Sequence, residues 1–235
     1  MFLQERRAIE VSNVHKRYGS TTALDGVSLT IERGELHILA GPNGSGKSTL
    51  LSIIAGAERP DKGRVSVLGL NPWRDHEEVS SRISALLDRT SIHPWATGIE
   101  VARLVSNVRG VEWGQVVDIA ERLNVKGFWR RPYMTYSSGM KKRLLLLLAL
   151  AGAPDVVILD EPFQGLDRET SKRLIGMIRE MASRESTIIV ATHIMPRELM
   201  SISTGVTMME LGRVVYSGRG KDAMSIAKAL GVECI

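Results

Sequence analysis

The chain has 235 residues, of which 43% are hydrophobic and 24% are charged, as is usual for a soluble globular protein large enough to bury a substantial core. The single cysteine, Cys234, excludes an intrachain disulfide framework and fits a reducing compartment. The formal net charge is only +5, and the basic residues are scattered, with short clusters at 130–131 and 141–143. We interpret them as a solvated surface; a nucleic-acid groove or a preference for acidic lipid headgroups is the alternative.

Two stretches bear on targeting and membrane insertion. The N-terminal MFLQERRAIEV has charged residues in place of an apolar core, so it does not resemble a signal peptide. The most apolar stretch, 144–159, is interrupted by Pro154 and Asp155 and falls short of the roughly 20 apolar residues that cross a bilayer. It predicts a buried helix followed by a buried strand, and we expect no membrane span in the chain itself.

The remaining pattern is that of an α/β core with a helical insert. β-Branched and apolar runs broken by glycine predict strands in the first third of the chain, and a helical pattern follows the run that ends at Gly41. Between Ser80 and Pro154 the strand signal fades, and the alternation of strands and helices then returns. Strands are expected at 8–18, 27–33, 35–41, 63–70, 155–161 and 186–193, helices at 47–55, 98–110, 112–125, 139–152, 167–183 and 196–202, and a hairpin at 205–218.

Residues 41–49 read GPNGSGKST, which matches the phosphate-loop pattern G-x-x-x-x-G-K-S/T between a predicted strand and a predicted helix. The glycines let the backbone curl until its N–H groups point at anionic oxygens, and the helix N-terminus adds a positive dipole end. Lys47 supplies a cation for the β- and γ-phosphates, and the Ser48 hydroxyl can ligate Mg²⁺. The predicted phosphate-binding residues are Gly41, Pro42, Asn43, Gly44, Ser45, Gly46, Lys47, Ser48 and Thr49.

Two adjacent carboxylates follow the apolar run VVIL. They are Asp160 and Glu161, at the carboxyl end of a predicted parallel strand, where α/β sheets bind ligands. Asp160 is placed to hold Mg²⁺ and Glu161 to polarise an attacking water. Together with the phosphate loop they predict a nucleotide-hydrolysing site.

With the stretch YSSGMKKR (136–143) followed by VILDEPFQGLD (157–167), the chain resembles the nucleotide-binding subunit of ATP-binding cassette (ABC) transporters over essentially its whole length. The order of motifs agrees: an aromatic residue, the phosphate loop, a helical insert, the signature loop, Asp-Glu, GLD and ATH. The resemblance implies a P-loop NTPase core with a mainly parallel sheet, an N-terminal antiparallel β region and a helical insert. It implies one ABC ATPase domain, with a core at 1–86 and 155–235 and a helical subdomain at 87–154 that carries the signature loop.

The resemblance also implies roles for individual residues. Tyr18 would stack on the adenine of ATP, His193 would reach the γ-phosphate and the attacking water, and Asp167 would link two sites across a dimer interface. With Glu161 and Lys47, His193 completes the catalytic set. Family members work as head-to-tail dimers, so the signature residues of one subunit would contact the ATP of the other. These signature residues are Ser137, Ser138 and Gly139.

Three features depart from the family pattern. Alignment by apolar residues places Asp88 where the family usually has a glutamine that touches Mg²⁺; a carboxylate is a harder ligand, so we expect Mg²⁺ contact with altered coupling. The signature has Ser138 where glycine is commoner and is most similar to those of single-cassette exporters. The sequence also ends at Ile235, soon after the last core element. The last two features favour export.

The function predicted from the sequence is therefore that of an ATP- and Mg²⁺-dependent ATPase subunit. It would act as a homodimer, or as a heterodimer with a second cassette, on the cytoplasmic face of a membrane and would drive a separate transmembrane permease, with no nucleic-acid partner. One alternative is a soluble ABC ATPase that acts on ribosomes or DNA. Another is a catalytically weak, ATP-gated clamp.

Overall fold

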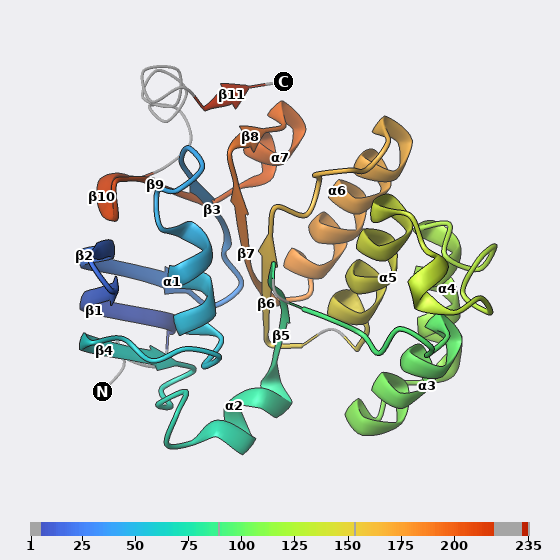
Figure 1. The fold of residues 1–235 in the computed structure, drawn as a ribbon. Helices are drawn as coiled ribbons and strands as arrows, with labels where there is room; N and C mark the ends of the chain where they lie inside the picture. The colour runs from blue at the N-terminus through green and yellow to red at the C-terminus, as the bar shows by residue number, and fades with distance from the viewer. Residues whose placement is uncertain (1–5, 89, 153, 219–231, 235) are drawn as a thin grey trace.

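The computed structural model describes residues 6–88, 90–152, 154–218 and 232–234. Its centre is a six-stranded sheet in the order β10-β9-β3-β7-β6-β5, in which the pairs among β9, β3, β7, β6 and β5 are parallel and β10 is an antiparallel edge (Figure 1). This arrangement confirms the mainly parallel sheet expected from the sequence. The strands are β3 (Leu36–Ala40), β5 (Ile83–Leu86), β6 (Val156–Asp160), β7 (Thr187–Thr192), β9 (Gly205–Glu210) and β10 (Arg213–Gly218).

A second, antiparallel sheet has the order β2-β1-β4 and confirms the antiparallel region expected near the N-terminus. It lies with helix α1 on one side of the central sheet, while α3 to α6 lie on the other (Figure 1). The elements are β1 (Arg7–Tyr18), β2 (Thr21–Glu32), β4 (Lys62–Val67) and α1 (Lys47–Ile54). Helix α1 ends as expected, because Gly56 takes the left-handed conformation, φ 75°, just beyond it.

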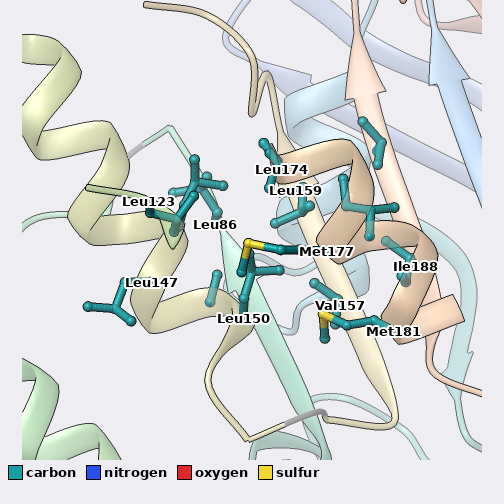
Figure 2. Packing of buried hydrophobic residues seen from close by; sticks show 14 of the residues in the cluster. Leu86, Leu123, Leu147, Leu150, Val157, Leu159, Leu174, Met177, Met181 and Ile188 are labelled. Carbon is teal, nitrogen blue, oxygen red and sulfur yellow. The ribbon is translucent and has the colours of Figure 1, made fainter. Parts of the chain in front are cut away.

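Both faces of the central sheet are buried under other elements, and successive side chains of a strand point to opposite faces. Val157 and Leu159 pack with the helices α5 and α6, whereas Val156 and Ile158 pack with α1 and the antiparallel sheet. Figure 2 shows the first of these clusters, in which leucines of α5 meet methionines of α6 over the strands. The continuous apolar runs of β6 and β7 follow from this two-sided burial.

Helices α3, α4 and α5 form the helical part of the chain that the glycine-bounded patterns predict. The apolar run in α5 is a buried helix as expected: Leu144, Leu146, Leu147 and Leu150 are almost fully covered. In the part of the chain that the structure describes, none of the helices has the length and apolar character needed to cross a membrane. The helices are α3 (Gly98–Arg109), α4 (Trp113–Arg122), α5 (Ser138–Leu150), α6 (Arg168–Ala182) and α7 (Arg197–Ile202).

Several short elements were not predicted. Helix α2 (His76–Arg82) spans the start of the region in which the strand signal fades, and strand β5, only four residues long, lies within that region. A 3₁₀ turn, η1 (Tyr133–Thr135), precedes the signature loop. Strand β8 (Ile194–Met195) directly follows His193 and pairs in parallel with β11 (Glu233–Cys234). The short strands β5 and β8 depend on pairing with distant residues, which local periodicity does not record.

The N-terminus of α3 is closed by a capping box. The Thr97 side chain accepts a hydrogen bond from the Glu100 backbone N–H, and the Glu100 carboxylate accepts one from the Thr97 backbone N–H at 2.8 Å. We expect Thr97→Ala to lower the free energy of unfolding by about 1 kcal/mol, because an orphan helix N–H loses its partner. Urea denaturation measures this, and Thr97→Ser, which keeps the hydroxyl, is the control; equal stability of all three proteins would contradict the prediction.

Candidate nucleotide-binding site

The chemically important residues meet at the carboxyl edge of the central sheet. The loop 41–46 follows β3, Glu161 follows β6 and His193 follows β7. The register brings these strand ends together, since Ala40 pairs with Thr192 and Asp160 with Ala191. A parallel sheet places all its carboxyl ends at one edge, so motifs more than a hundred residues apart form one site.

The phosphate loop has a shape that is set by its neighbours. A Cβ atom on Gly41 would lie 2.3 Å from the backbone oxygen of Met209, and one on Gly46, whose φ is 100°, would lie 2.5 Å from that of Ala23. The Gly212 N–H also donates a hydrogen bond to the Ser45 carbonyl at 3.1 Å. The loop is therefore packed between β9 and β2, and side chains at two of its glycines are excluded by contacts as well as by backbone conformation.

Lys47 is held inside this loop. Its side chain is only 5% exposed, and its Nζ donates to the carbonyls of Gly41 at 2.7 Å and Pro42 at 3.1 Å. Its Nζ also lies 3.8 Å from Glu161 Oε1. Burial lowers the pKa of Lys47, and the charges of Glu161 and Asp160 oppose that effect.

Asp160 is a buried carboxylate, 3% exposed. Neither of its oxygens makes a hydrogen bond of ordinary geometry with any residue in the described ranges. Burial raises its pKa; the nearby Ser48 hydroxyl, Lys47 and Lys142 lower it, and the negative charge of Glu161 raises it. A buried carboxylate without a partner is costly, and it is the kind of group that a hard cation satisfies.

Glu161 and His193 are in contact. The His193 backbone N–H donates to Glu161 Oε1 at 3.0 Å. The ring Nδ1 of His193 lies 2.9 Å from the same oxygen, but the direction does not suit a hydrogen bond. The hydrogen bond between the two residues is therefore the one from the His193 backbone. Glu161 has a φ of 46°, an uncommon conformation for a residue with a side chain, and its own N–H donates to Ala191. The bonds to β7 hold this conformation.

The three expected Mg²⁺ ligands come together. Ser48, Asp160 and Asp88 all line one hollow of about 450 Å³. Tyr18, expected to contact the adenine, also lines this hollow and is 41% exposed. Asp88 is exposed on the turn after β5, a strand that the sequence did not predict.

The signature loop lies at the start of α5. Ser137 caps the helix by accepting a hydrogen bond from the Met140 N–H at 3.3 Å, and Ser137 and Ser138 are both exposed. The preceding Tyr136 is buried and bonds to Gly98 and Phe128, which anchors the loop in the helical region. In the ranges that the structure describes, none of the hydrogen bonds or ion pairs joins residues 137–139 to the phosphate loop.

Two residues have roles in the structure that the sequence did not reveal. Lys142 was interpreted as part of a solvated basic cluster, and this is wrong: its half-buried Nζ donates to the Asp160 carbonyl at 3.2 Å, and burial lowers its pKa. Asp167 caps α6, with Oδ1 accepting from the Thr170 N–H at 2.8 Å and Oδ2 from its hydroxyl at 2.8 Å. Its expected contact across a dimer interface stays a prediction.

The chain is similar to known proteins over most of its length. Residues 24–164 match the family model described as ABC transporter. The daunorubicin/doxorubicin resistance ATP-binding protein DrrA of Streptomyces peucetius is 31% identical over 93% of this chain and 67% of its own length. The probable sulfate/thiosulfate import ATP-binding protein CysA of Chlorella vulgaris is 31% identical over 92% of each chain.

Solved structures share the fold. An ATP-binding subunit of an ABC transporter superposes with a TM-score of 0.83 at 24% identity, covering 95% of this chain and 94% of that one. The dimeric structure of MJ0796, a bacterial ABC transporter cassette, gives 0.80 at 23% identity, covering 91% and 99%. The chain belongs to the ABC transporter family. It is an ATP-binding subunit of that family, an ATPase in which hydrolysis is coupled to transport.

Proposed function

We propose that two cassettes, each like this chain, enclose two ATP molecules between them, with the signature loop of each completing the phosphate site of the other. The observation that carries the proposal is the exposed position of Ser137 and Ser138, without a bond to the phosphate loop of their own chain among the described residues. A capped helix N-terminus that presents a hydroxyl and backbone N–H groups to solvent suits an anionic ligand that another subunit holds. Two equal sites follow from a two-fold interface.

A complementation experiment tests this arrangement. Lys47→Met disables the phosphate loop and Ser137→Arg blocks the signature loop, so each variant alone has no complete site. If sites are shared, a mixed dimer has one complete site, and an equal mixture regains about a quarter of the wild-type ATPase activity because half the dimers are mixed. No recovery from two folded variants would contradict shared sites.

In this proposal the chain's own residues position the triphosphate and the attacking water. Lys47 and the loop N–H groups bind the β- and γ-phosphates, Glu161 orients and polarises the water, and His193 holds Glu161 through its backbone and contacts the γ-phosphate. Most of the rate acceleration then comes from positioning and from charge stabilisation.

The oxygen donors at the site fit Mg²⁺. Asp160 has buried oxygens without ordinary partners in the described ranges, and Ser48 and Asp88 line the same hollow, so these three residues would hold the ion. When bound, Mg²⁺ neutralises negative charge on the phosphates.

Asp88 is expected to contribute to Mg²⁺ binding. We expect Asp88→Asn and Asp88→Gln each to raise the Mg²⁺ concentration for half-maximal ATPase activity by about 3–10-fold, because an amide is a weaker ligand for a hard cation than a carboxylate. A Mg²⁺ titration of activity measures this, with Asp118→Asn on α4 as the control. An unchanged Mg²⁺ dependence in both variants would remove Asp88 from the metal site.

We also propose a separate transmembrane subunit as partner, which places the chain on the cytoplasmic face of the membrane. The helical region, 87–154, supports this because it carries large apolar side chains that are more than half exposed. They are Trp95 (69%), Leu104 (61%), Val108 (76%) and Met134 (51%). Co-purification from detergent-solubilised membranes would identify the partner. We expect the double variant Leu104→Glu, Val108→Glu to lose co-purification with the partner. Val215→Glu, at an exposed apolar site on β10, should keep it.

Export is the proposed direction. It is supported by the signature YSSGM and by the similarity to a resistance protein, while a similarly close relative is an import protein. We rank the ATP-gated clamp below a transport subunit because Glu161 and His193 lie in contact at the sheet edge. We rank the ribosome- or DNA-acting ATPase below it because the chain belongs to the ABC transporter family.

A further inference from the structure

Tyr18 sits at the end of β1 in a cluster of groups drawn from two distant segments. Its hydroxyl donates to Glu58 Oε2 at 2.5 Å, although the two residues are forty positions apart. Glu58 belongs to the loop that follows α1, the helix that begins with the phosphate-binding Lys47. The segment from Lys47 through α1 to Glu58 therefore connects the phosphate loop to the Tyr18 ring.

Lys16 completes the cluster. Strand residues two apart lie on the same face, so Lys16 and Tyr18 are neighbours. The Lys16 Nζ lies 3.3 Å from Glu58 Oε1, donates to the Arg59 carbonyl at 2.8 Å, and stands 5.4 Å from the centre of the Tyr18 ring. The Lys16 side chain is only 14% exposed, so the contact is partly desolvated.

The backbone fixes the loop to the strand from both sides. The Arg17 N–H donates to the Asp61 carboxylate at 2.7 Å, and the Asp61 N–H donates to the His15 carbonyl at 2.9 Å. The Glu58 N–H also donates to the Ser52 carbonyl at 3.2 Å, and the Glu58 carbonyl accepts from Trp73 Nε1 at 3.0 Å. Glu58 is therefore held in place independently of Tyr18, and it can define the position of the ring. A side chain fixed before a ligand arrives loses less freedom on binding.

We propose that Glu58 and Lys16 are positioning residues for base recognition, which hold the Tyr18 ring with its hydroxyl anchored and one face covered, so that the base stacks on the opposite face. The inference rests on the proposed function, in which Tyr18 contacts the base. It adds that the ring must be oriented as well as present. The purine contact then depends on Glu58, which lines the same hollow as Tyr18 and acts through the ring.

Separate measurements of base and phosphate binding test the proposal. Calorimetry without Mg²⁺ gives dissociation constants for ATP and for inorganic tripolyphosphate, which has no base. We expect Tyr18→Phe, which keeps the ring but loses the anchoring bond, and Glu58→Ala to weaken ATP binding about 3–10-fold, as the loss of one hydrogen bond does. Tripolyphosphate binding should not change.

Conservative and control variants make the outcome decisive. Glu58→Gln keeps an oxygen that accepts from Tyr18 and should bind ATP more tightly than Glu58→Ala. Methionine is a long apolar side chain that can still cover the Tyr18 ring but carries no charge. Lys16→Met should therefore also weaken ATP binding. Glu77→Ala, at an exposed site on α2, should resemble the wild type, and thermal melts show that each variant is folded.

The results that overturn the proposal differ from those that overturn its basis. If Tyr18→Ala weakens ATP binding but Tyr18→Phe and Glu58→Ala do not, the ring stacks without positioning and the inference is wrong. If Glu58→Ala weakens tripolyphosphate binding equally, the effect lies in the phosphate loop, and the inference is again wrong. If Tyr18→Ala leaves ATP binding unchanged, the proposed base contact itself fails.

Discussion

Glu161→Gln is expected to bind ATP·Mg²⁺, to stay dimeric with saturating nucleotide, and to hydrolyse ATP about 10²–10⁴-fold more slowly than the wild type. The amide cannot take a proton from water, whereas its side-chain oxygen can still accept the His193 N–H that Glu161 accepts at 3.0 Å. The substitution thus removes the general base and keeps the hydrogen bond to His193. Single-turnover hydrolysis and gel filtration with ATP·Mg²⁺ measure the two effects.

The elution position of this variant tests the shared site directly. If ATP is enclosed by two subunits, slow hydrolysis should trap the dimer. A monomeric Glu161→Gln at saturating ATP·Mg²⁺ would count against the shared site, and near-normal hydrolysis would remove Glu161 from the reaction. Glu77→Gln, the same change at an exposed position, should hydrolyse ATP normally and dimerise only transiently.

Asp160→Asn is expected to separate stability from function. The wild-type carboxylate is buried without an ordinary hydrogen-bond partner in the described ranges, so a neutral amide of the same shape should raise the free energy of unfolding of the nucleotide-free protein by about 1 kcal/mol. The same change should lower Mg²⁺-dependent hydrolysis at least about 100-fold, because the strongest candidate ligand is lost.

Urea denaturation with and without ATP·Mg²⁺ checks this prediction. The wild type should gain stability from ATP·Mg²⁺ beyond that from ATP with a chelator, and the variant should lose that difference. Asp118→Asn, the same change at an exposed site on α4, is the control. A variant that is destabilised without nucleotide would show that the Asp160 carboxylate is satisfied within the protein. A variant that keeps the Mg²⁺-dependent gain would show that Asp160 is not a metal ligand.

Local sequence patterns predicted most of the helices and strands. The helices α3 to α7 and the strands β1, β3, β4, β6 and β7 were expected close to their observed bounds, because glycine breaks and apolar periodicity mark them. The phosphate loop, Asp160 and Glu161 were expected to share one edge for a general reason: parallel strands align their carboxyl ends. That inference needs only the order of the elements. His193 was expected there from the resemblance to the family.

Contacts between distant segments were decided by the tertiary structure alone. Strand β5 exists because it pairs with β6, seventy residues away, and not because its four residues favour a strand. Lys142 looks like a surface cation, yet its position on α5 aims it at the Asp160 carbonyl. The bond between Tyr18 and Glu58 likewise requires the loop after α1 to fold against β1.

The sequence by itself determined which groups are present and that they converge at one sheet edge, because short-range patterns dictate strands, helices and turns. The tertiary structure decided which charges are buried, which carboxylate has no ordinary partner in the described ranges, and which residues orient the aromatic ring. Burial and long-range hydrogen bonds depend on how the two sheets and the helical region pack, and that packing is a property of the whole chain.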